Sequence, residues 1–141
     1  MEAKEYLKGI KRADTIINSM MKERDQLQGM RYRITQNLKP VMVSGGGTQG
    51  GFANASDRLI DLERALEREI DRFADLRAEA CAMLRQVEDE KLYEVLHRHY
   101  ILYDSFEHIA VDMNYTYRNI CYIHGRALQV FQKVLDAQHA V

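Results

Sequence analysis

The sequence contains no tryptophan, a single proline and only two cysteines among its 141 residues. The cysteines, Cys81 and Cys121, are too few for a disulfide framework, so we expect free thiols or small buried side chains. No apolar run approaches the roughly 20 residues that a membrane-spanning helix needs, which indicates that the chain is not a membrane protein. Residues 1–6 carry charges without a following apolar stretch, so we expect no secretory signal and a cytoplasmic protein.

The residue patterns of catalytic and metal sites are also missing. There is no nucleophile motif, and the glycine-rich segment lacks the lysine and the preceding strand of a phosphate-binding loop. We therefore predict that the protein is not an enzyme and that it binds no cofactor. All five histidines lie in the last third of the chain: His97, His99, His108, His124 and His139. His97 and His99 are two residues apart on a predicted helix and point to different sides, so we expect no metal site.

Two long stretches have the heptad spacing of paired helices. In residues 2–35 the seam consists of Tyr6, Ile10, Ala13, Ile17, Met20, Leu27 and Ile34, with Arg24 and Arg31 in its two remaining positions. Ser56 or Asp57 is the predicted cap of a second helix. Its seam consists of Leu59, Leu62, Leu66, Phe73, Leu76, Ala80, Met83 and Val87. Pro40 ends the first predicted helix, and residues 40–56, which hold five of the eight glycines, form a predicted connector.

These features predict a long antiparallel helical hairpin, similar to a coiled coil, over residues 1–87. Residues 1–40 carry nine Lys and Arg against five acids, whereas residues 57–90 carry six Arg against eleven acids. Opposite charges favour pairing of the two helices with each other. Exposed ion pairs are individually worth less than about 1 kcal/mol, however, and pairing between two chains stays equally open.

Residues 88–141 change to short helices separated by capping residues, which predicts a second, small domain. Helices are expected over residues 91–101, after Asp104 or Ser105, and from Thr116 onward. Their buried stripes are Leu92, Val95, Leu96 and Tyr100; Phe106, Ile109, Ala110 and Met113; and Ile120, Ile123, Ala127 and Phe131. A small residue, Ala110, is followed by Asn114 at the turn and by Ile120 and Ile123 at the spacing of a helix-turn-helix. The predicted fold class is therefore all-α, a helical hairpin followed by a helix-turn-helix domain.

The last predicted helix is basic within an otherwise acidic half of the chain. Residues 113–135 contain no acid, but they carry Arg118, Arg126 and Lys133. Such a local excess of positive charge points to a polyanionic partner. Tyr115 is expected to pack in the core, whereas Tyr117 and Tyr122 stay open between core packing and stacking on bases.

Several segments of this domain resemble a known family. Residues 96–101 (LHRHYI) and 105–110 (SFEHIA) are similar to the "leucine, basic, Tyr-Ile, then Ser-Trp-Glu-Glu-Ile-Ala" pattern of sigma-like phage proteins. Residues 113–118 (MNYTYR) and 123–128 (IHGRAL) resemble the recognition helix of the same group and its "Ile-His-Gly-Arg-Ala-Leu" end. The group is the phage and prophage regulators similar to ArpU and RinA, whose helix-turn-helix resembles the fourth conserved region of bacterial sigma factors.

The resemblance implies a phage or prophage transcription regulator that binds promoter DNA in the cytoplasm of a bacterial host cell. Its third helix would lie in the major groove of double-stranded DNA. The DNA-binding residues carried over are Thr116, Tyr117, Arg118, Asn119, Tyr122, Arg126 and Lys133. Thr116 caps the helix, Arg118 suits a guanine and Asn119 an adenine, while Arg126 and Lys133 suit the DNA backbone. Because this helix holds few cations, we expect a homodimer or host RNA polymerase to supply further contacts.

Two other functions fit the same features. A packaging protein similar to small terminase subunits also combines a DNA-binding domain with coiled helices, and it would form a large ring. An interaction-only module would use the helix-turn-helix to bind a host transcription factor without touching DNA. Stoichiometry and DNA binding in solution distinguish these alternatives from a regulator.

Overall fold

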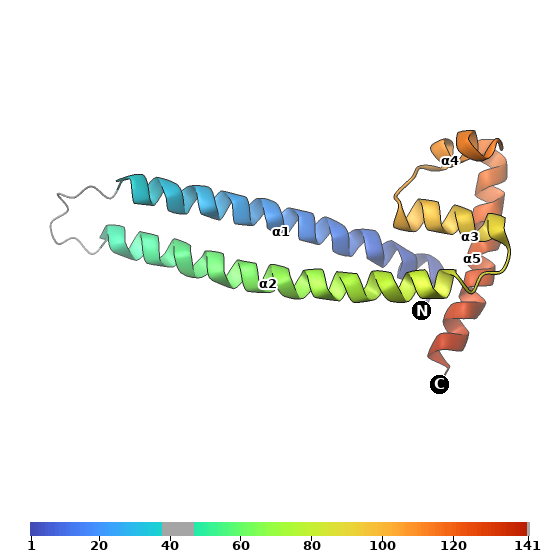
Figure 1. The fold of residues 1–141 in the computed structure, drawn as a ribbon, viewed down its shortest axis with the longest axis horizontal. Coiled ribbons are helices and arrows are strands. Elements are labelled where there is room, and N and C mark those ends of the chain that lie inside the picture. The colour runs from blue at the N-terminus through green and yellow to red at the C-terminus, as the bar shows by residue number, and fades with distance from the viewer. Residues whose placement is uncertain (38–46, 141) are drawn as a thin grey trace. The chain divides into compact units, whose positions relative to one another are not determined.

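The computed structural model describes residues 1–37 and 47–140, with the backbone alone described for residues 37 and 47–52. In these ranges the chain forms the helices α1 (Ala3–Asn37), α2 (Gly47–Leu84), α3 (Glu90–Leu96), α4 (Phe106–Met113) and α5 (Tyr117–His139), without a strand (Figure 1). A π-helical turn, η1 (His97–Ile101), continues α3. The all-α prediction is confirmed. No helix of the described ranges is both long enough and apolar enough to cross a membrane.

The beginning of α2 corrects one prediction. The connector was expected to extend to residue 56, but α2 already begins at Gly47, and Ser56 lies inside the helix instead of capping it. Extending an existing helix needs no new nucleation, so the cost of about 1 kcal/mol for each glycine does not stop it. Burial of Ala55 one turn before Leu59 adds packing energy to this extension. Pro40, the predicted end of the first helix, lies outside the described residues.

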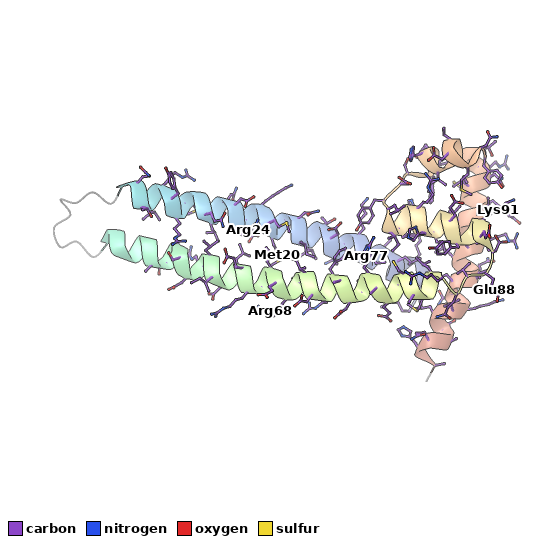
Figure 2. The ribbon with its side chains drawn as sticks, viewed as in Figure 1. Met20, Arg24, Arg68, Arg77, Glu88 and Lys91 are labelled. Carbon is purple, nitrogen blue, oxygen red and sulfur yellow. The ribbon has the colours of Figure 1, made fainter. Side chains whose placement is uncertain are left out.

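The chain divides into two compact units, of which unit 2 comprises Thr15–Arg72. Within unit 2, α1 and α2 run antiparallel, side by side, and pair within one chain (Figure 1). The predicted seams form the contact, with Ile17, Leu59 and Leu66 buried. Figure 2 shows Arg24 between the two helices and Arg68 on the outer side of α2. The hairpin prediction is thus confirmed, and Arg24 occupies the seam position that the sequence assigned to it.

Unit 1 comprises Met1–Asp14 and Phe73–Val141. Its main core combines the start of α1 and the end of α2 with α3, η1 and α5. The most deeply buried large side chains of this core are Leu7, Ile10, Met83, Leu84, Leu96, Phe131 and Leu135. Both predicted domains, residues 1–87 and 88–141, contribute to it. The domain boundary at residues 87 and 88 stays a prediction.

The first turn of α1 is fastened directly to α5. The amide of Ala3 donates to Gln132 Oε1 at 2.6 Å, and Gln132 Nε2 donates to the carbonyl of Met1 at 2.9 Å. The ring of Tyr6 lies against Phe131, with 6.1 Å between the centroids. Leu7 is fully buried although it lies outside the heptad seam. The start of α1 therefore packs on two faces, one toward α2 and one toward α5.

Candidate nucleic-acid interface

The two helices α4 and α5 are placed by three local capping interactions. The hydroxyl of Ser105 accepts the amide of His108 at 3.1 Å, and that of Thr116 accepts the amide of Asn119 at 3.1 Å. Between the helices Asn114 adopts the left-handed conformation, with φ 61° and ψ 41°. Asparagine tolerates this conformation better than other residues with a Cβ, because its side chain hydrogen-bonds locally. The predicted helix starts at Ser105 and Thr116 and the predicted turn at Asn114 are confirmed.

A small second core holds α4 against α5. It consists of Val95, Ile109, Ala110 and Ile120, with Phe106, Met113, Tyr115 and Ile123 packed around them. Tyr115 thus packs in the core as expected, and Lys91 Nζ lies 5.5 Å from its ring centroid. Ala110 at this crossing confirms the predicted helix-turn-helix geometry. The apolar side of α5 continues into the main core through Ala127, Phe131 and Leu135.

The structure leaves every predicted DNA-binding residue exposed. Thr116, Tyr117, Arg118, Asn119, Tyr122, Arg126 and Lys133 all have exposed side chains, with 51% of Tyr117 and 65% of Tyr122 accessible. Successive helical residues are turned by about 100°, which sorts these side chains into rows. Arg118, Tyr122 and Lys133 lie opposite the buried stripe. Asn119 and Arg126 form a neighbouring row, and Tyr117 lies at the opposite edge, beside α4.

Tyr117 connects the edge of this surface to α4. Its ring meets that of Phe106 edge-on, with 6.4 Å between the centroids. A hydrogen bond with Cys121, together with the negative charge of Cys121 and Glu107, raises the pKa of the Tyr117 hydroxyl. The raised pKa keeps the hydroxyl protonated at neutral pH, while half of the side chain stays accessible. Both Tyr117 and Tyr122 are surface residues, which removes core packing as an explanation for them.

A cluster of four aromatic and imidazole rings packs on the buried side of α5. His99 stacks on Phe106 at 4.1 Å and meets Tyr100 edge-on at 4.8 Å, while Tyr100 is hydrogen-bonded to His124 Nε2 at 2.7 Å. His99 Nδ1 lies 2.8 Å from the carbonyl of Asp104 and donates to it, since a carbonyl oxygen can only accept. The cluster therefore joins η1, α4 and α5. The sequence indicated these histidines only as possible metal ligands, and it contains no local signal for this role.

Burial favours the uncharged forms of His124 and Tyr100. Burial, with a smaller contribution from the charges of His99 and Lys4, lowers the pKa of His124 to about 4. Burial also raises the pKa of Tyr100 to about 12. At neutral pH both side chains are therefore neutral and suited to hydrogen-bonding each other. Among residues 1–37 and 47–140, no three His, Cys, Asp or Glu side chains lie close enough together to hold a metal ion.

Arg98 forms an ionic clamp between η1 and α4. Its Nε lies 3.1 Å from Asp104, a second nitrogen is hydrogen-bonded to Asp112, and Glu94 lies 3.8 Å away. The Arg98 side chain is only 16% exposed, so its charge is shielded from water on most sides. The hydrogen bond from Arg98 lowers the pKa of Asp112. The clamp fixes the helix that supports α5 against the preceding turn.

Replacing Arg98 with Gln is expected to lower the melting temperature by about 5 °C, because two carboxylates lose a shared cation. The matched control is Arg72→Gln, which removes an exposed pair with Glu69 at 3.1 Å and should change the melting temperature by about 1 °C or less. Thermal unfolding followed by circular dichroism measures both variants. Equal shifts in the two variants would mean that the clamp contributes no more than a surface ion pair.

Comparison of the chain with family models, curated proteins and solved structures gives no match. We therefore infer the function from the exposed residues of α5, from their charge and from the packing that holds this helix in place.

Proposed function

We propose that the protein is a DNA-binding transcription regulator of the phage or prophage type, with α5 as its recognition helix. One observation carries this proposal. The exposed face of α5 presents Arg118, Asn119 and Tyr122 without a single acid between residues 113 and 135, while the opposite face is buried in two cores. Such a helix is held rigidly in place, and its exposed surface attracts a polyanion.

Five of the predicted DNA-binding residues have a defined part in the proposed complex. Arg118 donates two hydrogen bonds to the O6 and N7 atoms of a guanine, and Asn119 pairs with the N6 and N7 atoms of an adenine. Because the two side chains lie in neighbouring rows, they reach different base pairs. The free amides of the first turn, next to the Thr116 cap, bind a phosphate. Arg126 and Lys133 contact the backbone farther along the groove.

Because α5 carries few cations, the proposal includes a partner that supplies further contacts. The affinity from counterion release rises with the number of phosphates neutralised, and α5 has only Arg118, Arg126 and Lys133 for this purpose. A homodimer doubles this number, and host RNA polymerase adds contacts of its own. Both partners are available in the cytoplasm of a bacterial host cell, where the proposed regulator acts on promoter DNA.

The proposed reading face is tested by replacing Arg118 and Asn119 together with Ala. We expect the preference for a specific fragment over random duplex to fall by about thirtyfold to ten-thousandfold, since each of the two base contacts contributes about 1–3 kcal/mol. The measurement is a fluorescence titration with fragments from the genomic neighbourhood of the gene. The control replaces Arg68 and Asn18, which are exposed in unit 2, with Ala and should retain the preference.

Three results would contradict the regulator. Unchanged preference in the double variant would remove the reading face. Equal weak or absent binding of all fragments by the native protein would favour an interaction module that binds a host transcription factor. A large ring in light scattering, together with DNA binding, would favour a packaging protein.

A further inference from the structure

Three lysines lie about one helical turn apart on the exposed side of α1 in unit 1. Lys4, Lys8 and Lys11 are spaced by four and three residues, so they lie on one face of the helix. All three side chains are exposed, whereas Leu7 and Ile10 between them are buried in the core. The stripe that these lysines form is therefore attached rigidly to the core that also holds α5.

At one end the stripe meets α5. Lys4 lines a pocket of about 410 Å³ together with Leu128, Gln129, Gln132 and Lys133 of α5. The hydrogen bonds of Gln132 with Ala3 and Met1 hold this end of α1 in place. Lys4 is also close enough to His124 for its charge to act on the imidazole. The cation of Lys4 thus adjoins the half of α5 that carries Lys133.

At the other end the stripe reaches the start of α4. Lys8 and Lys11 line a second pocket, of about 390 Å³, with His99, Tyr100, Tyr103, Asp104 and Ser105. Lys11 Nζ lies 5.7 Å from the ring centroid of Tyr103. Ser105 is the cap of α4, whose first turn directs amides outward. The lysine stripe therefore runs from the second half of α5 to the beginning of α4.

Acids adjoin the stripe, but the pockets at both of its ends keep a net positive charge. Asp104 lies 3.1 Å from Arg98 and also lines the pocket of Lys8 and Lys11. Glu2 is the acid in the pocket that holds Lys4 and Lys133, which leaves that pocket with one net positive charge. The pocket of Lys8 and Lys11 is likewise positive, because its two lysines outnumber its single carboxylate, Asp104.

We propose that Lys4, Lys8 and Lys11 bind the phosphate backbone of double-stranded DNA, as an extension of the surface formed by α5. This inference rests on the proposed function of α5. Seven residues of helix span about 10 Å, at about 1.5 Å for each residue. One DNA strand carries a charge for each 3.4 Å or so of its axis, and about three phosphates therefore fall within the length of the stripe. The stripe supplies the cations that α5 lacks, and it reads no bases.

The test removes the three charges together, as Lys4→Gln, Lys8→Gln and Lys11→Gln. The slope of log affinity against log salt should become less steep by about 2–3, and affinity should fall equally for specific and random duplex. The preference between fragments should stay unchanged, in contrast to the Arg118 and Asn119 variant. The triple replacement with Arg should keep the native slope. Circular dichroism verifies that each variant is folded.

A control with the same loss of charge separates position from net charge. Lys22→Gln, Arg58→Gln and Arg68→Gln remove three exposed cations from unit 2 and should leave the slope nearly native. Native binding with an unchanged slope in the lysine variant would overturn the inference and leave the proposed function standing. An equal decrease of the slope in the control variant would also overturn it. So would a lysine variant that loses polymerase binding alone and keeps its DNA affinity and slope. Absence of any DNA binding by the native protein would overturn both proposals.

Discussion

Replacing Phe131 with Ala is expected to lower the free energy of unfolding by about 3–5 kcal/mol. Phe131 is fully buried on α5, lies against Tyr6 of α1, and belongs to the core that joins α1, α2, α3 and α5. Truncation removes its transfer energy and leaves a cavity that rigid neighbouring helices fill only in part. Urea unfolding followed by circular dichroism measures the effect.

A loss of this size threatens folding of a small protein, so a milder variant accompanies it. Phe131→Leu should cost about 1–2 kcal/mol and remain folded. The surface control is Val111→Ala, at a side chain that is 78% exposed, with an expected change of about 0.5 kcal/mol or less. If Phe131→Leu and Val111→Ala have the same stability, Phe131 does not hold α5 to α1. DNA affinity at a temperature where Phe131→Leu is folded should be native, because Phe131 is buried away from the reading face.

Acidification from pH 7 to pH 5 is expected to lower the free energy of unfolding through His124 by about 1–2 kcal/mol. Burial lowers the pKa of His124 from 6.5 to about 4, so the folded protein keeps this imidazole neutral at pH 5. The unfolded chain takes up the proton as pH falls below about 6.5. Stability is therefore fully present above that pH and decreases until the folded protein is itself protonated, near pH 4. Partial solvent exposure of the side chain reduces the expected effect below that of the full shift.

His124→Gln isolates this contribution, because glutamine keeps a polar group near Tyr100 but does not titrate. The difference in unfolding free energy between pH 7 and pH 5, measured by urea denaturation, should shrink by about 1–2 kcal/mol in this variant. Burial also lowers the pKa of His97, so a smaller dependence of the same sign should remain. His139→Gln, at the exposed end of α5, should keep the native dependence. An undiminished pH dependence in His124→Gln would show that His124 does not titrate as the structure requires.

The sequence was most informative where structure depends on neighbouring residues. Ser105 and Thr116 cap helices because their hydroxyl groups accept amides three residues ahead, and Asn114 suits a left-handed turn by itself. The heptad seams could be predicted from the helical period alone. The start of α2 was predicted wrongly, because glycine and Ser56 indicate local breaks, whereas helix propagation and the burial of Ala55 depend on a partner helix.

The candidate interface could be located from the sequence. The packing that holds α5 in place could not be predicted from it. The basic, acid-free stretch and the exposed period of α5 identify Arg118, Asn119 and Tyr122 without coordinates. His99 and His124 are 25 residues apart in the numbering, and neither carries a local signal of ring stacking. The lysine stripe likewise lies more than 100 positions from α5, so its place beside Lys133 was beyond any local pattern.

By itself, the sequence determined the helices, their capped turns and the face that each long helix buries, because these follow from the helical period and from hydrogen bonds over a few residues. Tertiary structure alone decided that the first turn of α1 would be bound to Gln132 of α5, 129 positions away, and that Leu7 would be buried outside its seam. Contacts of this kind depend on which apolar faces meet in space. Burial of surface is non-directional, and a hydrogen bond between residues far apart in the numbering has no local pattern, so neither contact leaves a periodic trace in the chain.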